Sequence, residues 1–450
     1  MELTAHLIAQ LLPEARLPGA ALPRAVGVEF STERLRPGQV FFALQGERGH
    51  GIRFAPQAVE MGAAFVVSDR DYPGAVIVPD ARKALYRLAA YAREQLRGPV
   101  VAVSGSVGKT TTKQYLACAL NAFYSAGNLN TLPALAARMV GAAVEDPERP
   151  LVLELGIDHP GEMGQLVELV RPDIGVLTAI APSHLERLGS LEGVAREKSL
   201  LLKRSPVRFA SLQAAALLPE PVPGLQTYGL RSECRNGPED EPGVGVQGCV
   251  ASKGEWHQEV KAGGATFTVN APGRAVATNA VAAFAVGRSL GIPATVLSSR
   301  LSQCNLEDSR LQLKKAGDLR IIDDSYNSNP ASAASALDVL REQPQPWVAI
   351  LGDMLELGEE SRRYHLEIGE ASIGLDLVIA VGPEAAYIQQ ANPRSLTVHD
   401  AEEATRLLHR IPAGATVLVK GSRGVRLEKV VQALLQASRD GERAASGGTR

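Results

Sequence analysis

The stretch VVAVSGSVGKTT, residues 100–111, is the most informative part of this chain. Its first four residues are all apolar, as in a strand buried on both faces of a parallel sheet. The following SGSVGKTT brings two glycines, a lysine and two threonines to the start of a predicted helix. Backbone amides of such a turn, together with the helix N-terminus, can bind phosphate oxygens. The stretch therefore predicts a strand, a phosphate-binding loop and a helix in direct succession.

Two side chains of this loop suit nucleotide chemistry. Lys109 can reach the β and γ phosphates, and the Thr110 hydroxyl can ligate Mg²⁺. The spacing departs from the full phosphate-loop pattern, because two residues and not four separate Gly105 from Gly108. The alternative is a tight glycine turn with a solvated lysine. The apolar strand in front of the loop favours the phosphate-binding interpretation.

Similar apolar strands follow at residues 151–155 and 174–178, with helical patterns between them. This alternation is typical of a parallel sheet covered by helices on both faces. Residues 206–270 instead show short strands and turns, which suggests a small antiparallel excursion, and a helix is expected near 277–290. Residues 98–305 are therefore predicted to form a central P-loop mononucleotide-binding domain.

The flanking regions have their own patterns. Residues 1–97 combine short apolar strands with a helical pattern over 81–96. Residues 306–450 contain apolar strands that alternate with helices, as in a Rossmann-like open sheet, at 319–323, 347–351, 377–381 and 416–420. The sequence thus predicts an α/β protein of three domains: a small N-terminal α/β domain (1–97), the central parallel sheet (98–305) and a C-terminal Rossmann-like sheet (306–450). The small, polar tail 438–450 is predicted to be disordered.

Composition narrows the possible functions. Hydrophobic residues make up 45% of the 450 residues and charged residues 21%, so the chain is expected to be globular. Lys and Arg number 47 against 49 Asp and Glu, so the basic excess of a nucleic-acid-binding protein is absent. The 4 cysteines are far apart and form no CxxC pair, which argues against a disulfide scaffold or a structural zinc site. Neither a signal peptide nor an apolar span is visible, so we expect a cytoplasmic protein with no nucleic-acid partner and no stable membrane association.

Three residues after the loop are candidate metal-site residues, and each could instead have only a structural or solvent-facing role. Glu154 ends the strand at 151–155, where P-loop folds commonly support Mg²⁺, but it could also face water. His184 follows the strand at 174–178, where a lone histidine is more often structural. Lys198 lies on a predicted helix, and a lysine there usually faces solvent.

Together these residues resemble the Mur ligase family, and the resemblance spans nearly the whole chain. The strings DDSYNSNP at 323–330 and LGDMLELG at 351–358 are typical of the member that adds D-alanyl-D-alanine to UDP-N-acetylmuramoyl-tripeptide. The motifs that carry the resemblance are Gly105–Lys113, Gly127–Asn130, Glu154–Gly156, His184–Glu186 with Gly189–Val194, Asp323–Pro330, Leu351–Gly358 and Lys420–Arg423.

The resemblance implies ATP, two Mg²⁺ ions and a set of metal ligands. Thr110 and Glu154 would hold the first ion. His184 would bind the second, and Lys198 would be carbamylated to become a carboxylate-like group near it. The implied catalytic set is Lys109, His184, Lys198, Arg310 and Asp324.

The resemblance also implies nucleotide contacts. Asn279 would read the adenine, Arg310 would reach the phosphates from the third domain, and Asp324 with Asn327 would complete the site. The implied phosphate loop is Gly105, Ser106, Val107, Gly108, Lys109, Thr110 and Thr111. The N-terminal domain would bind the UDP-sugar. The usual Asp-Ser-Arg of that domain is replaced here by Ser31–Arg34, and the segment after Asn130 is shortened.

The expected reaction is formation of an amide through an acyl phosphate, by a cytoplasmic enzyme that is a monomer. ATP would phosphorylate the terminal carboxylate of the tripeptide, and the amine of D-alanyl-D-alanine would displace the phosphate. The third residue of the tripeptide is left open among diaminopimelate, lysine and ornithine. Two rival interpretations are another ligase of the superfamily, such as a folylpolyglutamate synthetase, and a binding module that has lost catalysis. The first rival is disfavoured by the two strings. The second is disfavoured by the intact Lys109, Glu154, His184, Lys198 and Asp324.

Overall fold

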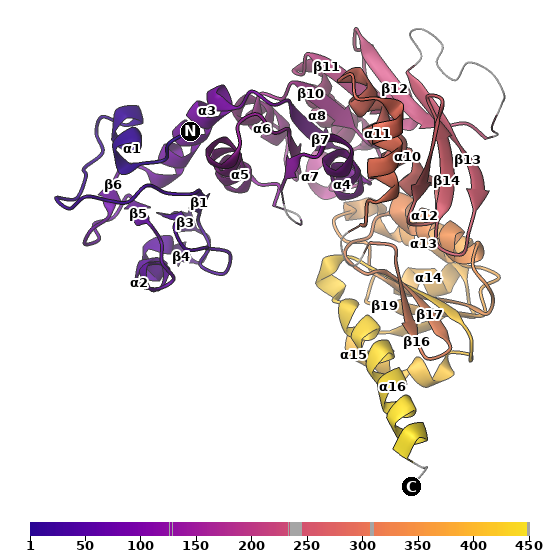
Figure 1. Ribbon diagram of the computed structural model, residues 1–450. Helices are drawn as coiled ribbons and strands as arrows, with labels where there is room; N and C mark the ends of the chain where they lie inside the picture. The colour runs from indigo at the N-terminus through magenta and orange to yellow at the C-terminus, as the bar shows by residue number, and fades with distance from the viewer. Residues whose placement is uncertain (126, 128, 233, 235–244, 307–309, 448–450) are drawn as a thin grey trace.

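The computed structural model describes residues 1–125, 127, 129–232, 234, 245–306 and 310–447. It contains three larger sheets, one within each of the predicted ranges 1–97, 98–305 and 306–450, and a separate two-stranded hairpin. The N-terminal and C-terminal sheets lie at opposite ends of the molecule, with the central sheet between them (Figure 1). The predicted α/β class with parallel sheets is confirmed.

The N-terminal sheet is parallel, with strand order β1-β2-β5-β6. Its strands are β1 (Val28–Glu29), β2 (Val40–Ala43), β5 (Phe65–Ser68) and β6 (Val76–Ile77). The hairpin β3 (Gln45–Gly46) and β4 (Gly49–His50) follows β2. The helices are α1 (Ala5–Leu11), η1 (Gly51–Phe54), α2 (Ala55–Glu60) and α3 (Ala81–Gln95). Asp80 caps α3, and each leucine buried on that helix contributes about 2 kcal/mol to stability.

The central sheet has nine strands in the order β15-β14-β13-β12-β11-β10-β7-β9-β8. They are β7 (Val100–Ser104), β8 (Phe123–Tyr124), β9 (Leu151–Glu154), β10 (Ile174–Leu177), β11 (Val207–Ser211), β12 (Leu225–Leu230), β13 (Val246–Lys253), β14 (Gln258–Ala262) and β15 (Ala265–Val269). Only the β13–β14 and β14–β15 pairs are antiparallel. The expected antiparallel excursion is therefore confined to the end of this segment, because β11 and β12 extend the parallel sheet.

Helices cover both faces of the central sheet, as the continuous apolar strands require. They are α4 (Lys109–Leu120), α5 (Leu132–Glu145), α6 (Glu162–Val170), α7 (Leu185–Leu188), α8 (Leu191–Lys203), α9 (Leu212–Ala216), α10 (Arg274–Ser289) and α11 (Ala294–Ser302). Helix α5 also packs against α3, and one apolar core is shared by the N-terminal and central regions. Because β7, β9 and β10 are adjacent and parallel, their carboxyl ends meet at one edge of the sheet, where such folds bind ligands.

The C-terminal sheet has the order β16-β17-β21-β18-β19-β20, parallel except for β16. Its strands are β16 (Gln312–Ala316), β17 (Leu319–Asp324), β18 (Trp347–Gly352), β19 (Leu377–Val381), β20 (Leu396–Val398) and β21 (Thr416–Lys420). The helices are α12 (Pro330–Arg341), η2 (Gly358–Glu360), α13 (Ser361–Ala371), α14 (Ala386–Ala391), α15 (Ala401–Arg406), η3 (Leu408–Arg410), η4 (Arg423–Val425) and α16 (Glu428–Gly447). The register pairs Asp324 with Lys420 at the ends of β17 and β21, so both residues reach the same edge.

Two expectations are corrected by this structure. The tail was expected to be disordered from 438, but α16 continues through Gly447, and only 448–450 lie outside the described residues. Residues 438–447 include two arginines, two alanines and one glutamate, which have high helix propensity, and these outweigh the two glycines. All four cysteines are paired, as Cys118–Cys304 and Cys234–Cys249. The packing of α4 against α11 brings the first pair together across 186 residues, which spacing along the chain could not reveal.

Candidate functional site

A cavity of about 560 Å³ opens where the central sheet meets the C-terminal domain. Segments from all three predicted domains line it, including Arg82 and Tyr86 of α3. Most of the residues predicted for nucleotide and metal binding line this one cavity: Ser106, Val107, Gly108, Lys109, Thr110, Thr111, Glu154, His184, Asn279, Arg310, Asp324 and Asn327. Gly105 adjoins it in the loop, and Lys198 lies behind it in the core.

The loop between β7 and α4 has positive φ angles at its two glycines, which residues with a side chain rarely adopt. Gly108 has φ +83, and a Cβ there would lie 2.9 Å from Asn279 Oδ1. Gly105 has φ +149, and a Cβ there would collide with the Thr178 hydroxyl. A side chain at either glycine would therefore displace its neighbour or strain the backbone. Lys109 Nζ donates to the Gly105 carbonyl at 2.7 Å, so the lysine folds back over its own loop.

Glu154 ends β9 and is almost fully buried, which excludes the water-facing alternative. Thr110 Oγ1 donates to Glu154 Oε2 at 2.8 Å, and Lys113 Nζ lies 3.2 Å from the same oxygen. Burial by itself would raise the pKa of Glu154, but the charges of Lys113 and Lys109 hold the pKa below its usual value. The carboxylate is therefore ionised, and beside a threonine hydroxyl it offers the oxygen ligands that Mg²⁺ prefers.

Lys198 is buried on α8, with 1% of its surface exposed, so the solvent-facing alternative is wrong. Burial lowers the pKa of its amine far below the usual value, and the charge of Lys109 lowers it further, although Asp158 and Glu197 oppose the shift. Burial also lowers the pKa of Lys109, although the charge of Glu154 opposes this shift. The shift is larger for Lys198, whose surroundings disfavour the charged amine.

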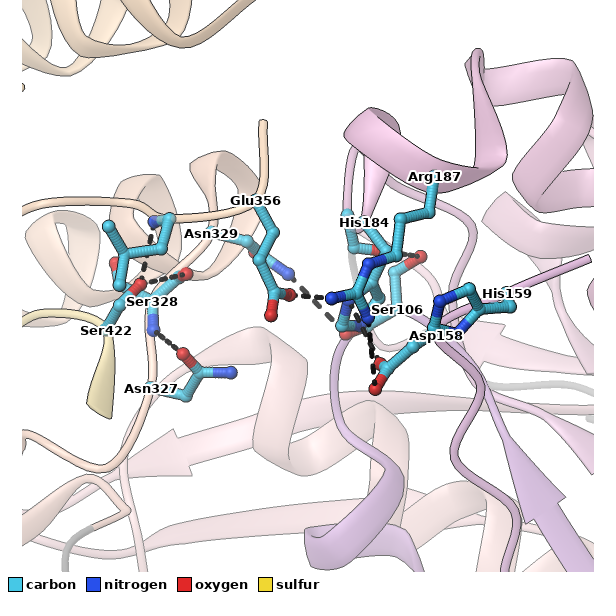
Figure 2. Close-up of polar contacts among 12 residues, drawn as sticks. Ser106, Asp158, His159, His184, Arg187, Asn327, Ser328, Asn329, Glu356 and Ser422 are labelled. Carbon is cyan, nitrogen blue, oxygen red and sulfur yellow. Dashed lines mark hydrogen bonds and ion pairs between the residues drawn. The ribbon is translucent and has the colours of Figure 1, made fainter. Parts of the chain in front are cut away.

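His184 meets two carboxylates, one from each side of the domain junction. Its Nδ1 lies 3.2 Å from Asp158 Oδ1 and 2.5 Å from Glu356 Oε2. Figure 2 shows Glu356 reaching toward His184 from the C-terminal domain, with Asp158 on the opposite side. One ligand atom from each residue lies within 4.8 Å of the others, a set that could hold a divalent cation. The hydrogen bond to His184 holds the pKa of Glu356 below its usual value.

The C-terminal domain contributes a second polar group to the cavity. Lys420 Nζ lies 2.5 Å from Asp324 Oδ2 and donates to the Asn327 carbonyl at 3.0 Å. Burial raises the pKa of Asp324, against the opposing charge of Lys420. The Arg310 guanidinium stacks over the Tyr326 ring at 4.2 Å. The carboxyl edge of β17 and β21 therefore faces the phosphate loop with one carboxylate and two cations.

A further contact joins the two halves. The Asn329 amide donates from Nδ2 to the Ser106 carbonyl of the phosphate loop at 3.5 Å (Figure 2). Its Oδ1 accepts from the Ser332 backbone N–H and caps α12. Sequence reasoning gave no role to Asp158, Glu356, Lys113 or Lys420, although the last three lie within quoted motifs. Their contacts depend on how distant segments meet, and no local pattern in the chain indicates that.

Models of protein families match two long segments of the chain. Residues 103–287 match the Mur ligase middle domain, and residues 309–423 match the Mur ligase, glutamate ligase domain. The UDP-N-acetylmuramoyl-tripeptide–D-alanyl-D-alanine ligase of Escherichia coli is 35% identical over 432 residues, covering 90% of this chain and 93% of that protein. The ligase of the same name from Bacillus subtilis is 31% identical over 437 residues, covering 91% and 93%.

Solved structures show the same fold. A crystal structure of MurF from Acinetobacter baumannii superimposes with a TM-score of 0.81 at 24% identity, covering 97% of this chain and 99% of that one. A MurF ligase from Thermotoga maritima, solved in complex with ADP, superimposes with a TM-score of 0.74 at 26% identity, covering 92% and 98%.

Proposed function

The chain belongs to the Mur ligase family, and we propose that it is the ATP-dependent amide ligase that joins D-alanyl-D-alanine to UDP-N-acetylmuramoyl-tripeptide in peptidoglycan synthesis. The observation that carries this proposal is the shared cavity. It brings the phosphate loop, the buried Glu154 and the Asp324–Lys420 pair of the C-terminal domain to one place. The relatives from Escherichia coli and Bacillus subtilis, both named as ligases of this activity, match over nearly the whole chain.

Amide synthesis from a carboxylate requires activation, because a carboxylate is a poor electrophile. A carboxylate oxygen of the tripeptide attacks the γ-phosphorus of ATP, and ADP leaves. The amine of D-alanyl-D-alanine then attacks the carbonyl carbon of the acyl phosphate and the C–N bond forms. The C–O bond to the phosphate breaks, inorganic phosphate leaves with the electron pair, and the nitrogen loses a proton. Negative charge accumulates on the transferred phosphoryl group, so cations fixed in the cavity supply much of the catalysis. Lys109 and Arg310 are placed to do this.

The donors in the cavity fit Mg²⁺. Thr110 and Glu154 supply a hydroxyl and an ionised carboxylate 2.8 Å apart, the ligand types of a nucleotide-bound Mg²⁺. His184, with Asp158 and Glu356 beside it, offers a second set of donors. Bound Mg²⁺ would neutralise charge on the phosphates. We propose that Lys198 is carbamylated and contributes a carboxylate to the second set, since its amine lies close enough to Lys109 and Asp158 to feel their charges.

The acceptor is proposed to enter from the N-terminal side. Arg82 and Tyr86 of α3 line the same cavity as the phosphate loop, as do Asn130, Thr131 and Leu132 of the central domain. Arg82 Nη2 donates to the Gln45 carbonyl, which fixes the guanidinium at this wall. A cation in this position suits an acceptor that carries phosphates and carboxylates.

No helix among the described residues is long and apolar enough to cross a membrane. We place the reaction in the cytoplasm because ATP and the UDP-linked acceptor are cytoplasmic metabolites, and we propose that the chain acts as a monomer, as the family resemblance implies.

Release of ADP tests the proposed function. Turnover is expected only when ATP, UDP-N-acetylmuramoyl-tripeptide and D-alanyl-D-alanine are all present. Stimulation by folate and glutamate would instead indicate a folylpolyglutamate synthetase. Nucleotide binding without turnover under any of these conditions would indicate a binding module.

Replacing Arg310 with alanine is expected to lower kcat by about a hundred-fold, because the variant loses a fixed cation beside the transferred phosphate. The dissociation constant for the UDP-linked acceptor should change less than about two-fold, since Arg310 lies on the C-terminal side of the cavity. Steady-state kinetics and calorimetry measure the two quantities. The matched control is Arg362→Ala, whose guanidinium stacks over Tyr387 at 5.6 Å in the same domain. A loss of acceptor affinity at unchanged kcat would contradict the role given to Arg310.

Replacing Glu356 with glutamine is expected to lower kcat roughly two- to five-fold, because half-exposed ion pairs are worth less than about 1 kcal/mol. The pair with His184 joins the two sides of the domain junction, so its loss should favour a more open arrangement. Small-angle scattering of the ADP complex should then give a larger radius of gyration than for the wild-type protein. Glu359→Gln, an exposed change in the same loop, is the control. Identical scattering curves for all three proteins would exclude this role for Glu356.

A further inference from the structure

Lys113 is a lysine that the proposed reaction does not use. It lies on α4 one turn after Lys109, and its side chain is completely buried. A buried ammonium group requires nearby groups that replace its lost hydration. Two groups do so here. The Nζ atom lies 3.2 Å from Glu154 Oε2 and donates to the Gly127 carbonyl at 2.6 Å.

The first contact controls the orientation of the Glu154 carboxylate. Oxygen Oε2 accepts the Thr110 hydroxyl at 2.8 Å and faces Lys113. Oxygen Oε1 is left on the side of Asn130, whose Nδ2 lies 3.5 Å away and which lines the cavity. A carboxylate held at one oxygen by two donors cannot rotate freely. The contact therefore leaves Oε1 toward the cavity, where a metal ion on ATP would bind.

The second contact reaches a different part of the cavity. Gly127 belongs to the segment between β8 and α5, which continues into the cavity wall at Asn130–Pro133. Asn130 packs closely against the chain just after β9, because a Cβ on Gly156 would lie 2.3 Å from Asn130 Nδ2. Helix α5 in turn packs against α3 of the N-terminal domain, which lines the acceptor side. Lys113 thus connects the metal-binding carboxylate to the wall that the acceptor would contact.

We propose that Lys113 is a positioning residue that orients the Glu154 carboxylate and at the same time holds Gly127, three residues before the cavity wall at Asn130–Pro133. The nucleotide-metal site and the acceptor side of the cavity then depend on one buried cation. This inference rests on the proposed function, because that function assigns an acceptor to the second wall.

The contact with Glu154 is tested by Mn²⁺ binding to the ADP complex, followed by electron paramagnetic resonance. Lys113→Met removes a positive charge close to the metal-binding carboxylate while keeping an unbranched side chain. Mn²⁺ is expected to bind about ten-fold more weakly to this variant, because Glu154 Oε2 loses the cation that keeps Oε1 toward the cavity. Lys113→Arg, which keeps a charged donor for Oε2, is expected to bind Mn²⁺ more like the wild-type protein. A lysine that only filled space would leave the Mn²⁺ affinity of Lys113→Met unchanged. The control is Lys203→Met, which removes an exposed lysine on α8.

The contact with Gly127 is tested by calorimetry with UDP-N-acetylmuramoyl-tripeptide, without nucleotide or metal. Lys113→Met is expected to bind this acceptor roughly five- to ten-fold more weakly than the wild-type protein, because the wall segment loses its anchor to α4. The proposal requires both effects, so an unchanged Mn²⁺ affinity or an unchanged acceptor affinity would overturn it.

A second pair of variants covers the case in which Lys113→Met does not fold. Glu154→Gln keeps Lys113 and its contact with Gly127, whereas Lys113→Met combined with Glu154→Gln removes both charges and leaves no unpaired ion. The double variant is expected to bind the acceptor roughly five- to ten-fold more weakly than Glu154→Gln. Equal affinities would overturn the proposal. If the wild-type protein itself did not bind the acceptor, the proposed function would fail, and the Mn²⁺ comparison would still decide whether Lys113 acts on Glu154.

Discussion

Replacing Lys109 with alanine is expected to lower kcat by about a thousand-fold, because a fixed cation at the transferred phosphoryl group contributes several kcal/mol to transition-state stabilisation. In the structure its Nζ donates to the Gly105 carbonyl inside the phosphate loop, and the surrounding burial strengthens any contact with phosphate oxygens. The loop itself is held by its glycines and by its contact with Thr178, neither of which involves the lysine. The fold should therefore survive the change.

Single-turnover measurement of ADP release checks this expectation, with circular dichroism to confirm that the variant is folded. Lys429→Ala is the control, because it removes an exposed lysine of α16 that pairs with Glu402. A Lys109→Ala variant that retained near wild-type kcat would refute the assignment of residues 105–111 as the phosphate loop.

The sequence predicts those parts of the fold that have strong local patterns. Strands β7, β9 and β10 could be found because each is a continuous apolar run, buried on both faces of the sheet. The edge strands β8 of the central sheet and β20 of the C-terminal sheet have two and three residues, too few for any periodicity to appear. The phosphate loop and Glu154 could be located for a related reason, since they follow strands whose carboxyl ends must share one edge.

The remaining part of the site arises from contacts between distant segments. Asp158 meets His184 because both follow strands of the central sheet, whereas Glu356 meets it only because the C-terminal domain faces that sheet. Lys420 acquires its partner through the register of β17 and β21, which is not visible in either strand alone. The exposure of Lys198 also could not be predicted from the sequence. Residue statistics place a helix lysine in solvent, yet the packing of α8 on the sheet buries it.

That burial is the physical basis for a second large effect, at Lys198. A carbamate forms when an uncharged amine nitrogen attacks the carbon of CO₂, an N–C bond forms and a proton leaves. The reaction needs the neutral amine, and burial together with the charge of Lys109 lowers the pKa of Lys198 in the required direction. The product carries a negative charge that an ordinary lysine cannot supply, and this charge suits a divalent cation beside His184.

Lys198→Ala is therefore expected to lower kcat by about a thousand-fold, because the site loses a charge that balances the metal during phosphoryl transfer. Lys198→Glu should also be poor, since glutamate is shorter than a carbamylated lysine. Small carboxylic acids such as acetate or propionate should partly restore Lys198→Ala by filling the vacated space. The matched control is Lys203→Ala, which removes an exposed lysine from the same helix.

Labelling with ¹³C-bicarbonate separates the carbamate from a lysine that serves packing alone. The wild-type protein should show a carbamate carbon signal by NMR, and Lys198→Ala should lack it. If Lys198 only filled space, an uncharged molecule of similar size would restore activity as well as a carboxylic acid does. The carbamate role predicts that only the carboxylic acid restores it. Full activity of Lys198→Ala, or a wild-type protein that takes up no label while active, would show that the buried lysine acts without CO₂. Burial disfavours the ammonium form of Lys198 and so favours the neutral amine, which is the form that reacts with CO₂. Burial and carbamylation are therefore linked at this position.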